Sequence, residues 1–453
     1  MKKTVLFPIL GVILFLGGLG AFIYFSNDDS PLRSYSSTKK SIKANEGRQL
    51  ELGEFSDTKD KVSDEPSALF NDPAISQAWG LKKSDAARAW SVTKGSRNIV
   101  VAVIDTGADI NHEDLKANIW TNPGETGLDS KGRDKANNGV DDDGNGFVDD
   151  VHGWNFVSNS NDLKDNHGHG THIACTIGAE GGNGKGISGI APEVSLMILK
   201  YYDPKVPNTD NLKNTVNAIK YAVQMGANII NYSGGGTEFS QDEKDAIITA
   251  EQKGILFVAA AGNEKSNSDK NKYYPADYGL KNIISVTAID QVTQVLPSSN
   301  YGVETVDIAA PGQSIEACLP GNKYAEMTGT SQATAFVSGA AAVVMAHKSA
   351  FNAEDVKKYI LATGDVDKGL LTKTKTSRKL NLFKALTVLD QGTTASGVKA
   401  LNPVDNNFTS DPNIPKSENA EINQGFSKFG KSLLDALEKE KKIPRMGTQQ
   451  EKP

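Results

Sequence analysis

The stretch "EMTGTSQATAFVSGAAAVVMAH", residues 326–347, raises the question that decides how this chain folds and acts. Its second half is a run of small and aliphatic residues, which predicts a helix buried in a core. The polar Ser331 stands where that helix should begin. Either Thr330 or Ser331 caps the free N–H groups, or Ser331 is a nucleophile at the positive helix end. Taken alone, the stretch favours the cap, because caps are far commoner than nucleophiles.

Short aliphatic runs alternate with helical patterns through most of the chain. The expected strands are 99–104, 194–199, 227–232, 255–261, 283–289 and 306–310. The expected helices are 212–225, 241–253, 331–347 and 354–362, with a closing helix near 381–389. Such alternation predicts an α/β three-layer sandwich, with a mostly parallel sheet covered by helices on both faces. Ligands bind such sheets at the carboxyl ends of the strands, so polar residues there are the candidates for function.

The N-terminus has the pattern of an export signal. Lys2 and Lys3 precede an uncharged apolar run over 5–25. We expect residues 1–25 to be a cleaved signal peptide or a retained signal anchor, because the run is roughly long enough to span a bilayer. The chain is therefore expected to be exported, to the cell envelope or the extracellular space. The polar residues 26–70 are interpreted as a linker or a short pro-segment.

The main domain is expected over residues 71–390, where the strand and helix patterns lie. Residues 391–453 turn polar and are interpreted as a mostly flexible tail, with one possible amphipathic helix at 426–441. No internal repeat is evident, and we assume a monomer.

Bulk charge and cysteine content limit the partners. The net charge is −6 and the pI about 5.7, which argues against nucleic acid as the main partner. The two cysteines, Cys175 and Cys318, do not make a disulfide scaffold. Export permits a bridge between them, and burial as two free thiols is the alternative.

Polar residues follow two of the expected strands, and three histidines cluster between them. Asp105 ends the first strand, and Asn263 follows the fourth. Each is also ordinary turn chemistry. His167, His169 and His172 lie within six positions. A zinc site is disfavoured, because the H-E-x-x-H pattern and further ligands at typical spacing are absent.

Asp105, His169 and Ser331 supply the three residue types of a nucleophilic triad. A serine nucleophile needs a base to take its proton, and the base needs an acid to hold its tautomer. The order Asp, His, Ser is that of subtilisin and differs from the orders of other serine hydrolases. An esterase or lipase of the α/β-hydrolase class is disfavoured, because no G-x-S-x-G surrounds Ser331.

Four separated motifs resemble the subtilisin-like serine proteases, or subtilases. They are "VAVIDTGADINHEDL" (101–115), "HGTHIA" (169–174), "AAGNE" (260–264) and "LPGNKYAEMTGTSQATAFVSG" (319–339). The resemblance spans about 71–390 and implies a subtilisin-like fold and a serine endopeptidase that acts on protein or peptide substrates. The alternative is a catalytically impaired, subtilase-like peptide-binding protein.

The resemblance implies a role for each matched residue. Ser331 would attack the scissile carbonyl, and His169 would accept its proton. Asp105 would orient His169. Asn263 matches the family's oxyanion asparagine and would act with the Ser331 N–H. His172 is expected to be structural.

The resemblance also places the substrate groove at an edge strand. Ser233, Gly234 and Gly235 would pair with the peptide backbone in β-augmentation. The pocket for the residue that precedes the scissile bond would be lined by Ser233, Gly234, Gly235, Ala260, Ala261 and Gly262. Tyr273 stands where many subtilisins carry glycine, so we expect its ring to shorten this pocket and favour small or mid-sized residues.

An acidic stretch, "NNGVDDDGNGFVDDVHGWNF" (137–156), predicts a calcium site. The candidate ligands are Asp141, Asp143, Asn145 and Asp149, spaced as positions 1, 3, 5 and 9 of an EF-hand-like loop. Position 12 is His152, so Asp150 or another group must replace the usual glutamate. Oxygen ligands favour Ca²⁺ over zinc, and a solvated acidic loop is the alternative. The resemblance suggests a second calcium site, at Asp114 and Asn183.

Two residues of the serine motif depart from the family. The family usually has Met and Pro where this chain has Gln332 and Ala335. Because alanine keeps the N–H that proline lacks, we expect Ser331 to sit slightly differently here.

Overall fold

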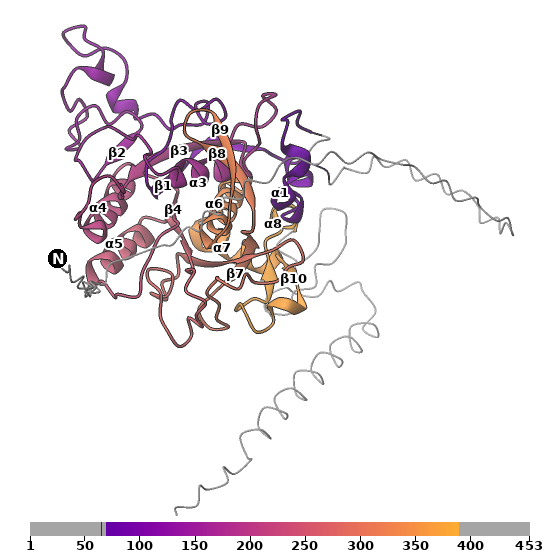
Figure 1. Ribbon diagram of the computed structural model, residues 1–453. Helices are drawn as coiled ribbons and strands as arrows, with labels where there is room; N and C mark the ends of the chain where they lie inside the picture. Colours follow the sequence, from indigo (N-terminus) through magenta and orange to yellow (C-terminus); the bar gives the residue numbers. More distant parts are fainter. Residues whose placement is uncertain (1–64, 66–68, 389–453) are drawn as a thin grey trace, which may run out of the picture. The chain divides into compact units, whose positions relative to one another are not determined.

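The computed structural model of this chain describes residue 65 and residues 69–388 (Figure 1). The expected signal or anchor at 1–25, most of the polar segment after it, and the tail with its candidate helix at 426–441 lie outside the described residues. Within the described part, no helix has the length and apolarity needed to cross a membrane. Contacts group the chain up to Thr387 into one unit, and Val388–Pro453 into another.

A nine-stranded sheet forms the centre of the main unit. Its strands are β1 (Gly95–Asp105), β2 (Gly153–Asn155), β3 (Glu193–Lys200), β4 (Ile229–Tyr232), β5 (Leu256–Ala260), β6 (Ile283–Ile289), β7 (Ile308–Pro311), β10 (Asp365–Val366) and β11 (Arg378–Lys379). Their order is β10-β11-β7-β6-β5-β4-β1-β3-β2, and every neighbouring pair is parallel except β10 with β11. The six predicted strands are all present, because their aliphatic runs are buried on both faces.

Helices cover both faces of this sheet. They are α1 (Trp79–Lys83), α2 (Ala86–Trp90), α3 (His169–Gly178), α4 (Asn211–Gln224), α5 (Gln241–Gln252), α6 (Thr330–His347), α7 (Ala353–Thr363) and α8 (Leu382–Thr387). Short 3₁₀ helices are η2 (Ile75–Gln77), η3 (Pro123–Glu125), η4 (Lys135–Asn137) and η5 (Lys368–Leu370).

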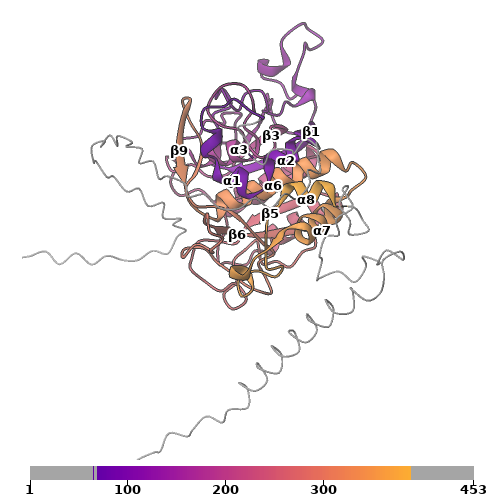
Figure 2. The same ribbon diagram turned by 90° about the vertical axis from the view of Figure 1, so that its right-hand side faces the viewer.

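The two faces of each strand serve different cores. In β1, Val101 and Val103 pack with α3 and α6, whereas Ala102 and Ile104 pack with α4 and α5. The layer of α1, α2, α3, α6, α7 and α8 faces the viewer in Figure 2, and α4 and α5 lie on the other side of the sheet. The expected three-layer α/β sandwich is thereby confirmed.

The helix α6 is buried along almost its whole length, as the opening stretch predicts. Its residues from Thr330 to Val344 are all buried. Small residues allow this close packing: a Cβ on Gly339 would collide with Ile190, and it would lie 2.9 Å from the carbonyl oxygen of Ile177 in α3. The helix therefore lies directly against α3, and its first turn brings Ser331 to the edge of the sheet.

A two-stranded antiparallel hairpin, β8 (Ile315–Leu319) and β9 (Lys323–Met327), leads into α6. The alternating strand and helix patterns in the sequence did not predict this hairpin. Cys318 of β8 forms a disulfide with Cys175 of α3, and both are fully buried. Of the two alternatives for the cysteines, the structure contains the bridge. It ties the histidine helix to the hairpin that precedes Ser331, across 143 residues of sequence.

We predict that the double variant Cys175→Ala/Cys318→Ala loses about 2–4 kcal/mol of unfolding free energy, because the bridge no longer restricts the unfolded chain. Guanidinium unfolding measures this. The parent protein unfolded under reducing conditions is the control and should match the variant. A variant as stable as the oxidised parent would contradict the prediction.

Candidate active site

The end of β1 holds an aspartate against the imidazole of α3. His169 Nδ1 donates to Asp105 Oδ1 at 2.8 Å, and the backbone N–H of Thr106 donates to the same oxygen at 2.8 Å. The Asp105 side chain is 4% exposed and that of His169 is 17% exposed. Because the carboxylate only accepts, it fixes the imidazole proton on Nδ1 and leaves Nε2 free to accept a proton.

The same contact sets the charge behaviour of the imidazole. Burial by itself would lower the pKa of His169. The charge of Asp105, the hydrogen bond to it, and a further contribution from the charge of Asp165 raise the pKa of His169 above its ordinary value of 6.5. The site therefore stabilises the imidazolium that forms when His169 accepts a proton.

Ser331 lies in the first turn of α6, next to the end of the neighbouring strand β4. Its Oγ donates to the carbonyl oxygen of Ser233 at 3.0 Å, and Ser233 Oγ donates to the Ser331 carbonyl at 3.2 Å. Ser233 directly follows β4, which pairs with β1 through Ile104 and Tyr232. The neighbouring strand ends thus bring the contacts of Ser331 and of Asp105 to the same edge of the sheet. The Ser331 hydroxyl itself points to the Ser233 carbonyl.

Asn263 is held at the start of the same helix. Its Oδ1 accepts from the Thr330 N–H at 3.1 Å and from the Thr330 hydroxyl at 3.2 Å. The acceptor end of the amide is therefore engaged, and its NH₂ group is left to donate. A Cβ on Gly329 would lie 3.5 Å from Asn263 Nδ2 and 3.6 Å from Asn263 Oδ1, so the end of this amide lies beside Gly329. The Ser331 N–H is one of the first four of the helix, which have no partner within it.

His172, the second histidine of α3, has a different environment. Its Nε2 lies 2.9 Å from the Ile315 carbonyl and 3.1 Å from the Ala325 carbonyl, one on each strand of the β8–β9 hairpin. Burial lowers its pKa to about 4, so it is neutral at pH 7 and donates to one or both carbonyls. It is a second tie between α3 and the hairpin.

One aromatic ring lies against two of the residues expected to line the specificity pocket. A Cβ on Gly235 would lie 2.5 Å from Tyr273 Cε1, and one on Gly262 would lie 3.0 Å from Tyr273 Cδ2. The ring of Tyr273 thus lies against both glycine backbones. A backbone bridge between Gly236 and Tyr274 holds the two walls together. Of the other expected lining residues, Ala260 ends β5, and Gly234 approaches the Tyr201 hydroxyl.

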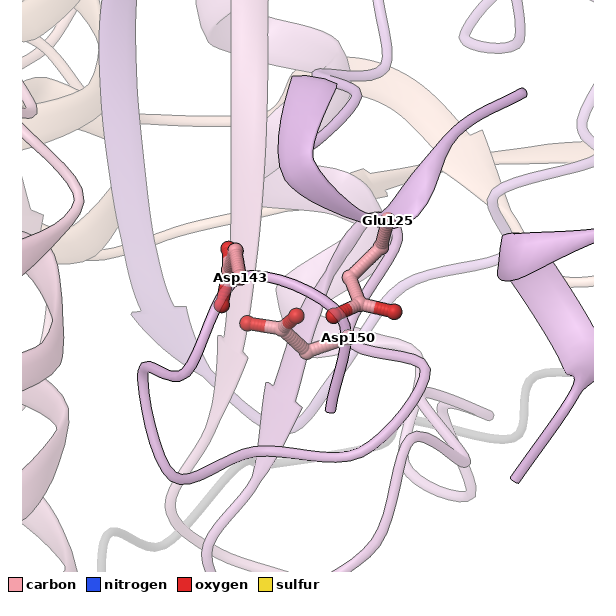
Figure 3. Close-up of side chains that lie close together, drawn as sticks. All are labelled: Glu125, Asp143 and Asp150. Carbon is pink, nitrogen blue, oxygen red and sulfur yellow. The ribbon is translucent and has the colours of Figure 1, made fainter. Parts of the chain in front are cut away.

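Three acidic side chains converge in the loop region before β2 (Figure 3). One carboxylate oxygen each of Glu125, Asp143 and Asp150 lies within 4.8 Å of the others. Glu125 and Asp150 are fully buried, and burial raises the pKa of both. Glu125 Oε1 accepts from the Asp142 N–H at 2.7 Å, whereas its Oε2 is buried without a hydrogen-bond partner. The Tyr221 hydroxyl donates to Asp150.

The expected EF-hand-like set is only partly gathered here. Asp143 belongs to the cluster, and Asn145 Nδ2 donates to Asp150 Oδ2 at 2.9 Å. The carboxylate of Asp141 accepts instead from the backbone N–H groups of residues 144–146, and that of Asp149 accepts from Gly139. Two of the four expected ligands thus accept hydrogen bonds from the loop backbone and lie outside the cluster.

The second expected pair lies together. Asn183 Nδ2 donates to Asp114 Oδ1 at 2.9 Å, and the Tyr324 hydroxyl donates to Asp114 Oδ2 at 2.9 Å. Asp72 accepts from Gly182 and Gly184 in the same loop. Burial raises the pKa of Asp72, and the charge of Asp114 adds to this.

Sequence reasoning missed three residues of this region. Glu125 stands alone in the sequence, and only its burial and position reveal it. Thr330 was considered solely as a cap, although it orients Asn263. Asp165 was given no role, although an aspartate four residues before His169 is a signal that could have been followed.

Comparisons with known proteins show the family to which the chain is similar. The model of the Subtilase family matches residues 96–391. The thermophilic serine proteinase of Bacillus sp. (strain AK1) is 35% identical over 335 residues, which cover 71% of this chain and 72% of that protein. Thermitase of Thermoactinomyces vulgaris is 33% identical over 317 residues, covering 70% and 98%. The subtilisin-like protease 1 of Plasmodium berghei is 32% identical over 297 residues, covering 61% and 48%.

Proposed function

Because the chain belongs to the subtilase family and is a serine-type endopeptidase, we propose that it cleaves peptide bonds through Ser331, His169 and Asp105. One observation carries the proposal: Asp105 fixes the His169 tautomer at 2.8 Å, at the strand end next to the one that holds Ser331. A peptide-binding protein without catalysis has no need for this aligned and charged pair.

In the first step, Ser331 Oγ attacks the carbonyl carbon of the scissile bond, and His169 Nε2 takes its proton. The imidazolium then gives this proton to the leaving amine as the C–N bond breaks. Water then attacks the resulting ester as His169 Nε2 takes its proton, and the imidazolium gives this proton to Ser331 Oγ as the ester bond breaks. Asp105 keeps its charge throughout and stabilises the imidazolium.

The negative charge of each tetrahedral intermediate falls at the start of α6. The Asn263 NH₂ group and the Ser331 N–H are the proposed donors to this oxyanion, and the positive helix end adds to their effect. Thr330 keeps the Asn263 amide from turning over, because both its donors engage the amide oxygen.

The hydrogen bond from the Ser331 hydroxyl to the Ser233 carbonyl gives the substrate a part in activating the nucleophile. A peptide that pairs as a strand with Ser233–Gly235 places its own N–H groups against the backbone carbonyls of these residues. The substrate N–H then replaces the Ser331 hydroxyl at the Ser233 carbonyl, and the hydroxyl turns to His169.

We propose export as the setting of this activity, with residues 1–25 as signal or anchor. The disulfide supports this, because such bridges persist in oxidising compartments. N-terminal sequencing of the protein from its host tests it, and a cytosolic protein that starts at Met1 would overturn it.

Calcium fits the cluster of Glu125, Asp143 and Asp150. Subtilases generally bind calcium, and the unpartnered buried Glu125 Oε2 is the kind of oxygen that such a cation takes. A cation there would neutralise the carboxylates and tie the loop to the core through the Asp150–Tyr221 contact. Asp114, Asn183 and Asp72 are the proposed residues of a second site, where the two carboxylates repel each other.

We predict that Ser331→Ala abolishes peptide hydrolysis, with a loss of about 10⁶-fold in kcat. Removing the oxyanion donor of subtilisin costs about 10²–10³-fold in kcat, and Asn263→Ala should cost as much here, with KM nearly unchanged. Steady-state kinetics on a chromogenic peptide measures both. Unchanged kcat in either variant would contradict the assignment.

In the parent enzyme, kcat/KM should fall as the pH drops through a midpoint above 6.5, because the raised pKa of His169 keeps this base protonated below that midpoint.

We predict that Tyr273→Gly opens the specificity pocket. Phenylalanine before the scissile bond should gain about 10- to 200-fold in kcat/KM, since the ring no longer fills the pocket. Peptides with alanine at that position are the internal control and should change little. A parent enzyme that already prefers large aromatic residues would refute the role of the ring.

We predict that calcium stabilises the protein by about 2–3 kcal/mol at 100 times its dissociation constant, and that a chelator reverses this. Glu125→Gln should remove much of the calcium-dependent shift in unfolding midpoint. Asp141→Asn is the matched control and should retain it, because the Asp141 carboxylate lies outside the cluster and accepts three N–H groups of the loop backbone. The reverse outcome would favour the EF-hand-like ligand set.

A further inference from the structure

A second buried aspartate organises the loop that precedes the catalytic histidine. Asp165 is 5% exposed. Its Oδ1 accepts from Thr106 Oγ1 at 2.9 Å, His167 N at 2.9 Å and Gly168 N at 2.7 Å. Its Oδ2 accepts from Thr171 N at 2.9 Å and Thr171 Oγ1 at 2.7 Å. Five donors converge on one carboxylate, which is far more than a loop turn needs.

These bonds connect Asp165 to both halves of the catalytic pair. Thr106 Oγ1, which donates to Asp165, also accepts from Gly170 N at 2.9 Å. The Thr106 N–H donates to Asp105. Asp165 thus holds, through Thr106, the backbone on the C-terminal side of His169 and the residue that follows Asp105. Its bonds to His167 and Gly168 hold the N-terminal side.

The position of His169 in the helix creates an electrostatic problem that Asp165 solves. His169 is the first residue of α3, and Gly168 at the N-cap has no side chain to offer the free N–H groups. The positive end of a helix disfavours a cation in its first turn. Asp165 takes the place of a cap, because it accepts the N–H of Thr171, and it brings a full negative charge to that end.

We propose that Asp165 is a positioning residue for the catalytic imidazole, fixing the helix start that carries His169 and supplying a second negative charge to its imidazolium. It touches neither substrate nor reacting atoms and acts through Thr106 and the first turn of α3. The inference rests on the proposed role of His169 and extends it.

The other ionisable groups near His169 do not supply this charge. Asp105 is the direct partner, on β1. His172, on α3, is neutral at pH 7, and the ring of His167 lies 6.2 Å from that of His169. Lys200, the buried cation that holds the Lys164 carbonyl in the same loop, is paired with Asp203 at 2.7 Å.

The variant Asp165→Asn tests the proposal, because it keeps one acceptor and removes the charge. We expect the acid limb of kcat/KM to move to lower pH by about 0.5–1 unit, since the imidazolium loses a stabilising anion. The plateau kcat should fall about tenfold or more as the helix start loosens. Asp162→Asn is the matched control: Asp162 is an exposed charge three residues earlier, and its loss should leave the limb in place.

A purely structural Asp165 would lower the plateau without moving the limb, and that result would overturn the proposal. Thr106→Val separates positioning from charge, since it cuts the hydroxyl link but keeps both carboxylates. We expect a three- to tenfold loss of kcat with KM and the limb unchanged. If Asp165→Asn does not fold, as judged by circular dichroism, this variant decides, and an unchanged kcat would overturn the proposal.

An NMR titration makes the outcome independent of catalysis. In full-length protein carrying Ser331→Ala, the His169 imidazole should titrate at lower pH with Asp165→Asn than without it. If the parent enzyme proves inactive, the proposed function fails, yet this shift still reports on Asp165. An unmoved titration in folded protein refutes the role of Asp165 alone.

Discussion

The pairing of two parallel strands, β1 with β4, is the constraint on which the site depends. Ile104 lies opposite Tyr232 in this pairing, so the next residues along each strand, Asp105 and Ser233, emerge side by side at the carboxyl edge of the sheet. Asp105 then holds the imidazole of α3, and Ser233 holds the first turn of α6. A slip of one residue in either strand would turn these side chains to opposite faces and remove the contacts that hold His169 and Ser331 at this edge.

The two helices that meet at this edge are tied to each other by more than packing. The buried disulfide joins α3 to β8, and His172 joins it to both strands of the β8–β9 hairpin. Because that hairpin leads into α6, the helices that carry His169 and Ser331 are joined to one connected support. In the proposed mechanism, the Ser331 hydroxyl leaves the Ser233 carbonyl and turns to His169.

Much of this could be read from the sequence, because the signals are local. The aliphatic runs predict strands β1 and β6, and the run of small residues predicts the buried helix α6. The spaced motifs around Asp105, His169 and Ser331 indicate the family. What could not be read depends on tertiary contacts. Glu125 joins Asp143 and Asp150 only after folding, and the loop backbone, which carries no sequence pattern, decides that Asp141 and Asp149 are satisfied elsewhere.

The central claim is that one serine, at the start of one buried helix, is made nucleophilic by a histidine and an aspartate from other elements. Mass spectrometry of the folded protein after treatment with a fluorophosphonate tests this most directly. We expect one adduct per chain, on Ser331, formed more slowly as the pH falls below the pKa of His169. Folded protein that forms no adduct, or forms it on another residue, would show that Ser331 is not activated in this way.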